Sequence, residues 1–229
     1  MTFLIIFISI ILGILFLLFL IIIIRKSLNK SNNSKIKSQI KNLQEEKGIK
    51  GEIIVDTYLK ELLKDNEYLL TNLLIPYNKN NDKTEIDAIL ITHKGVFCIE
   101  IKNWSGIIYG NDEDKYWYQK LNDSNLNKNQ HRNPVKQNEN HCEIVSRTIK
   151  NKNIKINNVV IFMKINDYKN IHSNHVYSLL DFISIYKTLP DSCKDNNSLE
   201  KIYSILSKYK ASEEELNKHK NKLQNKYKD

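Results

Sequence analysis

The fold of this chain is decided between Asp87 and Lys102, where the sequence reads DAILITHKGVFCIEIK. Two apolar runs flank the segment His93-Lys94-Gly95, which is a turn signal short enough to join them as an antiparallel hairpin. Residues 96–102 are apolar on both faces over most of their length, which is typical of a central strand covered on both sides. We therefore expect a β-sheet with a central strand that ends in charged residues.

The charged residues of this hairpin are expected to meet at one point. Glu100 and Lys102 are two residues apart, so on a strand they project from the same face, and Asp87 can reach them from the neighbouring strand. Burying such charges is costly unless they are paired or bind a metal. The two carboxylates and the backbone carbonyl of Ile101 are hard oxygen ligands, which suit Mg²⁺ or Mn²⁺.

This arrangement fits phosphodiester hydrolysis. A metal held there would bind phosphate oxygens and lower the pKa of an attacking water, while Lys102 orients that water or offsets developing charge. A buried salt bridge between Lys102 and one acid is the alternative, although it would leave net negative charge buried. Acid-x-Lys triplets also occur at residues 45–47, 113–115 and 167–169, but only residues 100–102 lie in an apolar strand one hairpin after an Asp.

Further segments surround the hairpin in a fixed order. They are Gly48-Ile49-Lys50-Gly51-Glu52, Glu85-Ile86-Asp87, the run GVFCIEIKNWSG at residues 95–106, and Asn133-Pro134 followed by Gln137. Together they resemble the nuclease-related domain family over roughly residues 48–165. That family is assigned to the PD-(D/E)xK endonuclease-like superfamily, so the resemblance implies an α/β, restriction-endonuclease-like domain with a central mixed β-sheet flanked by helices.

The resemblance also implies roles for individual residues. By motif position, Glu52 is similar to the family's helix glutamate, and Asp87 and Glu100 are similar to its metal-binding acids. Lys102 matches the catalytic lysine, and Gln137 matches the helix glutamine near the site. Trp104, at the end of the strand, is more typical of packing than of base stacking.

The N-terminus carries a different signal. Residues 3–24 contain no charge, and at about 1.5 Å per residue they span the roughly 30 Å core of a bilayer. We expect a transmembrane anchor over residues 1–26; a cleaved signal peptide is disfavoured because the run is too long and no small-x-small cleavage site follows it. Arg25, Lys26 and Lys30 follow the run, so the positive-inside rule predicts a single-pass cell-membrane protein with a cytoplasmic domain.

The rest of the chain is expected to contain a linker over residues 27–47, the nuclease-like domain over 48–165, and a helical extension of the same domain over 166–229. The apolar patterns predict strands at residues 68–76, 84–92, 96–102, 107–109, 116–121, 159–163 and 176–178. They predict helices within residues 40–64, from Asn133-Pro134 onward, and at residues 179–189 and 199–210. Residues 213–228 read as a charged helix that is more solvated than packed.

Charge and cysteine content narrow the class of partner. The net charge of +9 lies outside the apolar run of residues 3–24 and favours polyanions, either nucleic acid or the anionic membrane leaflet, although a general Asn, Lys and Ile bias would also raise it. Three cysteines without a Cys-x-x-Cys pair argue against a disulfide framework and a structural zinc site. Neither His141-Cys142 nor the pair His172 and His175 has the spacing of a zinc site with further ligands.

The sequence therefore predicts a membrane-anchored, metal-dependent nuclease, with DNA as the expected substrate. One alternative is a non-catalytic module on the same fold that binds nucleic acid or protein at the membrane. Another is a structural membrane protein, in which the basic linker and the terminal helix bind anionic lipid.

Overall fold

The computed structural model describes residues 51–121, 129–151, 154–164, 168–192 and 195–226, together with residues 14, 19, 20 and 26. The expected anchor and linker lie almost wholly outside these residues. Within the described part of the chain, no helix is both long and apolar enough to cross a bilayer. Residues 50–229 belong to one compact unit, and the fold is that of this unit.

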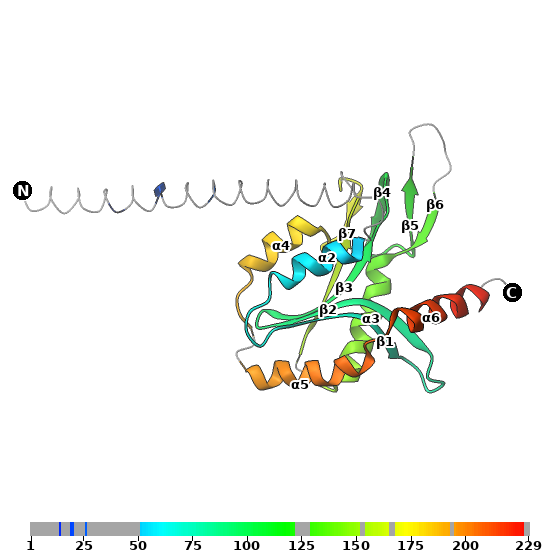
Figure 1. Cartoon of the computed structure of the whole chain (residues 1–229). Helices are drawn as coiled ribbons and strands as arrows, with labels where there is room; N and C mark the ends of the chain where they lie inside the picture. Colours follow the sequence, from blue (N-terminus) through cyan, green and yellow to red (C-terminus); the bar gives the residue numbers. More distant parts are fainter. Residues whose placement is uncertain are drawn as a thin grey trace, which may run out of the picture. The chain divides into compact units, whose positions relative to one another are not determined.

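A five-stranded mixed sheet forms the centre of this unit, in the order β1-β2-β3-β7-β9 (Figure 1). The strands β1 (Tyr68–Pro76), β2 (Lys83–Thr92) and β3 (Gly95–Lys102) are antiparallel, which confirms the expected hairpin. The strands β7 (Ile156–Phe162) and β9 (Val176–Ser178) run parallel to β3. This architecture confirms the mixed α/β class with a central sheet.

Helices cover both faces of the central sheet. On one side lie α2 (Gly51–Lys60) and α4 (Leu179–Thr188); on the other lie α3 (Pro134–Ile149) and α5 (Asn196–Leu206) (Figure 1). The alternation of β3 separates the two sides: Phe97 contacts the aromatic rings of α4, whereas Cys98 belongs to the cluster formed with α3 and α5. A central strand apolar on both faces is thus explained by two helical layers.

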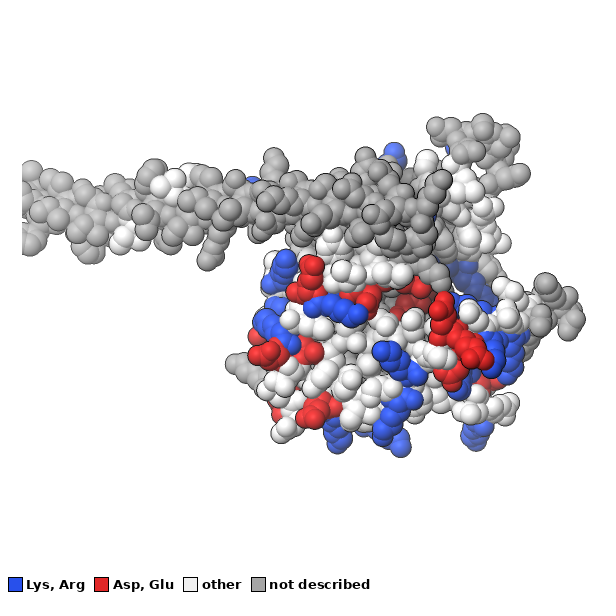
Figure 2. All heavy atoms as spheres, in the orientation of Figure 1, with Lys and Arg blue, Asp and Glu red and all other residues white. Residues whose placement is uncertain are grey.

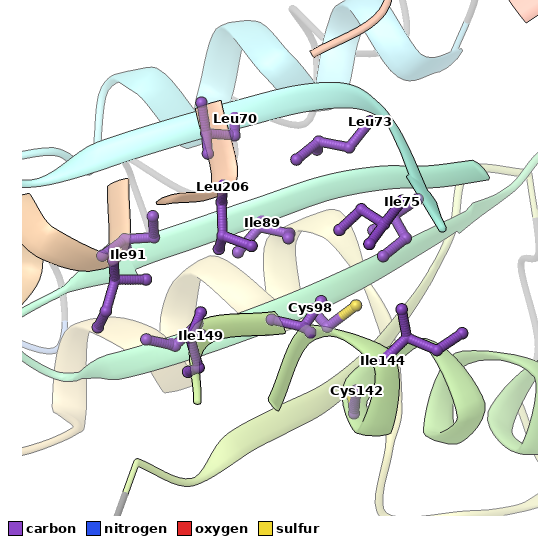
Figure 3. Close-up of a cluster of buried hydrophobic side chains, with 14 of the residues drawn as sticks. Leu70, Leu73, Ile75, Ile89, Ile91, Cys98, Cys142, Ile144, Ile149 and Leu206 are labelled. Carbon is purple, nitrogen blue, oxygen red and sulfur yellow. The ribbon is translucent and has the colours of Figure 1, made fainter. Parts of the chain in front are cut away.

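The cluster between the sheet and α3 holds the site's scaffold in place. Figure 3 shows Cys98 of β3 close to Ile144 of α3, with Ile149 and Leu206 further along the same layer. Burying side chains of this size contributes about 1.5–3 kcal/mol each. Cys98 and Cys142 are buried free thiols.

A second, four-stranded sheet has the order β6-β5-β4-β8 and contains β4 (Ile107–Asn111), β5 (Tyr116–Lys120), β6 (Asn129–Arg132) and β8 (Ile171–His172). Trp117 of β5 is fully buried and stacks parallel to Phe162 of β7, which joins the two sheets. Gly110 lies so close to the Trp117 ring that an added Cβ would come within 2.4 Å of it. Of these strands, β6 and β8 were not expected from the sequence.

The terminal helix α6 (Glu213–Lys226) follows the short 3₁₀ turn Ser207–Tyr209 and is less solvated than its pattern indicates. Leu216 is only 6% exposed, and the Lys220 ammonium lies 2.9 Å from a Glu85 carboxylate oxygen of β2. Just before the helix, the Ala211 amide donates to the Asn72 carbonyl of β1 at 2.8 Å. These contacts fix the helix against the β1–β2 hairpin, so the expectation of a mainly solvated helix is only partly correct.

Candidate active site

The site begins where the ladder between β2 and β3 ends. The last paired residues are Ala88 and Ile99, and beyond them Asp87 Oδ2 accepts a hydrogen bond from the Ile101 amide at 2.8 Å. The neighbouring β1–β2 ladder skips Asp87 and the residue opposite it, Asn72, which has a left-handed backbone with φ of 59°. The Asp87 carboxylate therefore accepts the hydrogen bond that a backbone carbonyl would accept in a continuous ladder. We call the point where β2 and β3 separate, beyond Ala88 and Ile99, the β2–β3 fork.

Glu100, Lys102 and Gln137 form a closed group beside this fork. The Lys102 ammonium donates to Glu100 Oε1 at 2.6 Å and to Gln137 Oε1 at 3.2 Å, and Gln137 Nε2 donates to Glu100 Oε1 at 2.9 Å. Glu100 is only 4% exposed. The structure thus brings the motif glutamine of α3 into direct contact with the two charged residues of β3.

The start of α3 positions Gln137. Asn133 caps the helix, because its side-chain oxygen accepts from the amides of Val135 and Lys136, and Pro134 occupies the first helical position. The Asn133 side-chain amide donates to the carbonyls of Asn111, Asp112 and Asp114. This single buried side chain ties the helix that carries Gln137 to the β4–β5 turn.

His141 also belongs to the site, although from the sequence it was weighed only as a zinc ligand. Its ring is buried; Nδ1 lies 3.4 Å from Glu100 Oε2, and Nε2 lies 3.2 Å from the Thr84 hydroxyl. Four residues separate His141 from Gln137, so both lie on one face of α3. That helical spacing is the signal that could have identified it.

The two carboxyl groups of the site have opposite electrostatic environments. Burial, followed by the nearby charge of Glu100, raises the pKa of Asp87 well above its usual value, although the Ile101 amide and Lys102 act against this. Burial also disfavours ionised Glu100, but the neighbouring His141 and Lys102 outweigh it and lower the pKa of Glu100. Glu100 is therefore the ionised member of the pair, and repulsion raises the cost of ionising Asp87.

Glu52 stands apart from this group. It is exposed in the first turn of α2, and no hydrogen bond or ion pair joins it to Asp87, Glu100, Lys102 or Gln137. Its negative charge still contributes to the raised pKa of Asp87, which places it close to the fork. The structure thus brings four of the five predicted side chains together and leaves Glu52 at their edge.

The donor set suits a hard divalent cation in kind. Mg²⁺ is commonly held by one or two carboxylates, with water and substrate phosphate completing its shell. Asp87 Oδ1 makes no hydrogen bond within the described residues. A cation bound there would favour the ionised form of Asp87, which burial and the charge of Glu100 otherwise disfavour. Within the same residues no group of three or more His, Cys, Asp or Glu side chains is arranged to hold a metal. Asp87, Glu100 and the Ile101 carbonyl would therefore form a sparse ligand set.

Trp104 flanks the site and serves in packing. Its ring stacks on His131 with centroids 4.2 Å apart, and its edge meets Phe162 at 5.4 Å. The Lys102 ammonium lies 5.7 Å from the Trp104 centroid, which is within cation–π range. The tryptophan thus forms one wall beside the lysine.

Comparison with known proteins adds a family assignment. The model of a family described as nuclease-related domain matches residues 47–163, a range that includes every residue of the site. The chain is also 29% identical over 185 residues to an uncharacterized protein of Bacillus anthracis, which covers 79% of this chain and 85% of that protein. No solved structure gives a significant match.

Proposed function

The chain belongs to the nuclease-related domain family, and from this premise we propose that it is a metal-dependent nuclease with its active site at the β2–β3 fork. The reaction would be hydrolysis of phosphodiester bonds in nucleic acid, with DNA as the expected substrate. We further propose that the domain belongs to the PD-(D/E)xK endonuclease-like superfamily and acts in the cytoplasm, tethered to the cell membrane through residues 1–26.

One observation carries the proposal: a buried, ionised Glu100 contacts Lys102 and Gln137 beside the β2–β3 fork, where the Asp87 carboxylate accepts the Ile101 amide. A salt bridge alone needs one acid and one base, whereas this site holds a second acid, Asp87, whose ionisation is disfavoured by burial and by repulsion from Glu100. Carboxyl groups with such perturbed pKa values cluster at functional sites. The family assignment makes phosphodiester hydrolysis the chemistry that fits.

The side chains divide the work among them. Lys102 holds three ammonium donors beside Glu100, so it can orient a water for attack and offset charge on the phosphate. Gln137 accepts from Lys102 and donates to Glu100, which fixes both in one geometry. Asp87 and Glu100, with the Ile101 carbonyl, would hold the cation. When bound, Mg²⁺ or Mn²⁺ would supply Lewis-acid polarisation of the phosphate and a lowered pKa of bound water.

A nuclease assay of the full-length protein in mild detergent tests the proposal. We expect labelled DNA to be cleaved with Mg²⁺ or Mn²⁺ and to remain intact in EDTA. Lys102→Ala and Asp87→Asn should each abolish cleavage, while Lys201→Ala, at an exposed position of α5, should cleave like the wild type. If the wild-type protein cleaves neither DNA nor RNA with either metal, the enzymatic proposal fails.

A non-catalytic binding module is the second candidate, favoured by the engagement of Glu100 on both sides. Lys102 and Gln137 bind Oε1, and His141 Nδ1 lies 3.4 Å from Oε2, so both oxygens of the carboxylate already have neighbours within the protein. Calorimetric titration with Mn²⁺ separates the two candidates. Metal uptake that disappears in Asp87→Asn supports the enzyme, and the absence of uptake in the wild type supports the binding module.

A further inference from the structure

A large cleft opens beside the candidate active site. Its volume is about 930 Å³, and α3, α6, the start of β2 and the strands β5 and β6 all contribute to its lining. Gln137 and His141, which contact Glu100, lie in the same lining. A ligand in this cleft would therefore touch the two side chains that contact Glu100.

The lining of this cleft is basic. Five of its side chains carry positive charge, namely Lys83, Lys115, Arg132, Lys136 and Arg147. Two carry negative charge, Glu85 and Glu143, and the Glu85 carboxylate is already paired with Lys220 at 2.9 Å. On the face seen in Figure 2, Lys and Arg side chains are interspersed with acidic ones. The lining of the cleft carries an excess of positive charge.

Two of the basic side chains are spaced along one helix. Lys136 and Arg147 of α3 are eleven residues apart, and both line the cleft with Asn140 between them. At 1.5 Å per residue they are about 16 Å apart along the helix axis. That length is enough to span several phosphates of one strand.

Aromatic and amide groups complete the lining. Tyr77 is 44% exposed, and Tyr116 lies under the Lys115 ammonium, 5.2 Å from its ring centroid. Of these two rings Tyr77 is the exposed one, and an exposed aromatic ring beside a cationic groove is a usual stacking surface for an unpaired base. An anionic membrane surface would instead meet exposed basic side chains from a flat face, and it would not need a walled cleft.

We propose that this cleft binds the sugar-phosphate backbone of one nucleic-acid strand and leads it to Glu100. Arg132, Lys136 and Arg147 contact phosphates along that strand, and Tyr77 offers a stacking surface. The inference rests on the proposed function only for the step that follows binding, because binding itself requires no metal and no hydrolysis.

Salt-dependent binding tests the proposal directly. Fluorescence anisotropy would follow a labelled single-stranded DNA binding to the full-length protein in EDTA, so that no cleavage occurs. The variant Arg132→Gln/Lys136→Gln/Arg147→Gln should bind about tenfold more weakly at roughly 50 mM salt. Its slope of log affinity against log salt should fall by about 2, since each lost phosphate contact removes about 0.7.

A matched control carries the same loss of charge outside the cleft. Lys187→Gln/Lys201→Gln/Lys208→Gln changes three exposed lysines of α4, α5 and the 3₁₀ turn. We expect its affinity and salt slope to stay close to those of the wild type. Equal losses in the two triple variants would overturn the proposal, because they would show that net charge alone binds DNA. Loss of binding to anionic vesicles in the cleft variant, with unchanged DNA binding, would also overturn it.

A single substitution distinguishes the loss of a phosphate contact from misfolding of the triple variant. Arg147 is exposed near the end of α3, and Arg147→Gln should lower the salt slope by about 0.7 without changing thermal unfolding. An unchanged slope would count against the cleft. The proposed function fails separately: wild-type protein that binds DNA through the cleft but never cleaves it with Mg²⁺ or Mn²⁺ refutes the nuclease and retains the cleft.

Discussion

At the scale of single residues, Gln137 is the most informative position of the site. It makes hydrogen bonds to both Glu100 and Lys102, so Gln137→Ala removes two charge-assisted contacts without removing a charge. Such bonds are worth about 1.5–3 kcal/mol each, and losing the equivalent of one of them in the transition state predicts a loss of cleavage rate of about 10- to 100-fold. Single-turnover cleavage measures the loss.

Glu139→Gln is the matched control for this substitution. Glu139 is exposed on the same helix, does not line the cleft, and has no contact with Glu100 or Lys102 among the described residues. We expect it to cleave at nearly the wild-type rate. If Gln137→Ala cleaves as fast as Glu139→Gln, the glutamine has no positioning role.

His93 gives a prediction about pH and stability at the hairpin turn. Its ring lies between Asn196 Oδ1 at 2.8 Å and the buried Glu67 carboxylate at 3.0 Å; the hydrogen bond to Asn196, followed by that to Glu67, raises the pKa of His93. A raised folded-state pKa stabilises the protein below the unfolded value of about 6.5, and this stability is lost as pH rises through the folded value.

Urea unfolding between about pH 5.5 and 8.5 measures this effect. The wild type should lose free energy of unfolding as pH rises from about 6.5, and His93→Gln should show a flatter profile over the same range. Parallel profiles for the two proteins would show that another group is responsible.

The sequence predicted most of the site's residues, and it failed where contacts are distant along the chain. Glu100 and Lys102 lie on one strand, so their shared face follows from the two-residue period. His141 is 41 residues from Glu100, and its spacing of four residues from Gln137 indicates a shared helix face but not the carboxylate that this face meets. Only the docking of α3 on β3, which sequence periodicity cannot specify, brings its ring to the carboxylate.

At the scale of elements, the cap of α3 connects stability with the site. Asn133→Ala should lower the free energy of unfolding by about 2–3 kcal/mol, because it removes the cap and leaves three carbonyls without their amide donor. Asn133→Asp keeps the capping oxygen but places a carboxylate against those carbonyls. Urea denaturation should therefore show a loss for both variants, and a wild-type midpoint for either would contradict this role.

The same scale shows which elements the sequence could predict. The strand at residues 68–76 was predicted with its observed bounds, since its apolar run ends at a turn-forming polar segment. The strand Asn129–Arg132 was missed because all four residues are polar and pair only with β5. The terminal helix was read as solvated because its contact with the domain depends on a single buried leucine, Leu216, and on charge pairs such as Lys220–Glu85.

At the scale of the whole molecule, the terminal helix α6 lies beside both the candidate active site and the cleft. The segment before α6 is held to β1 at Asn72, the residue opposite Asp87. From there α6 reaches Glu85 and lines the cleft with His219 and Leu223. The C-terminal helix is thus placed to shape access to the fork, although it lies outside the matched family range of residues 47–163.

The expected membrane tether supplies the last prediction. Residues 3–24 carry no charge, so the full-length protein should stay in the membrane pellet through alkaline carbonate extraction, and deletion of residues 1–26 should release it to the soluble fraction.

Because Arg25, Lys26 and Lys30 follow the run, a C-terminal tag should resist protease in right-side-out vesicles and be digested after detergent is added. Replacing these three residues with Gln keeps the apolar run and removes the orientation signal, so anchoring should persist while tag protection weakens. Carbonate-soluble wild-type protein would refute the anchor, and a tag digested in intact vesicles would place the cleft and the fork on the opposite side of the membrane from the nucleic acid that they are proposed to bind.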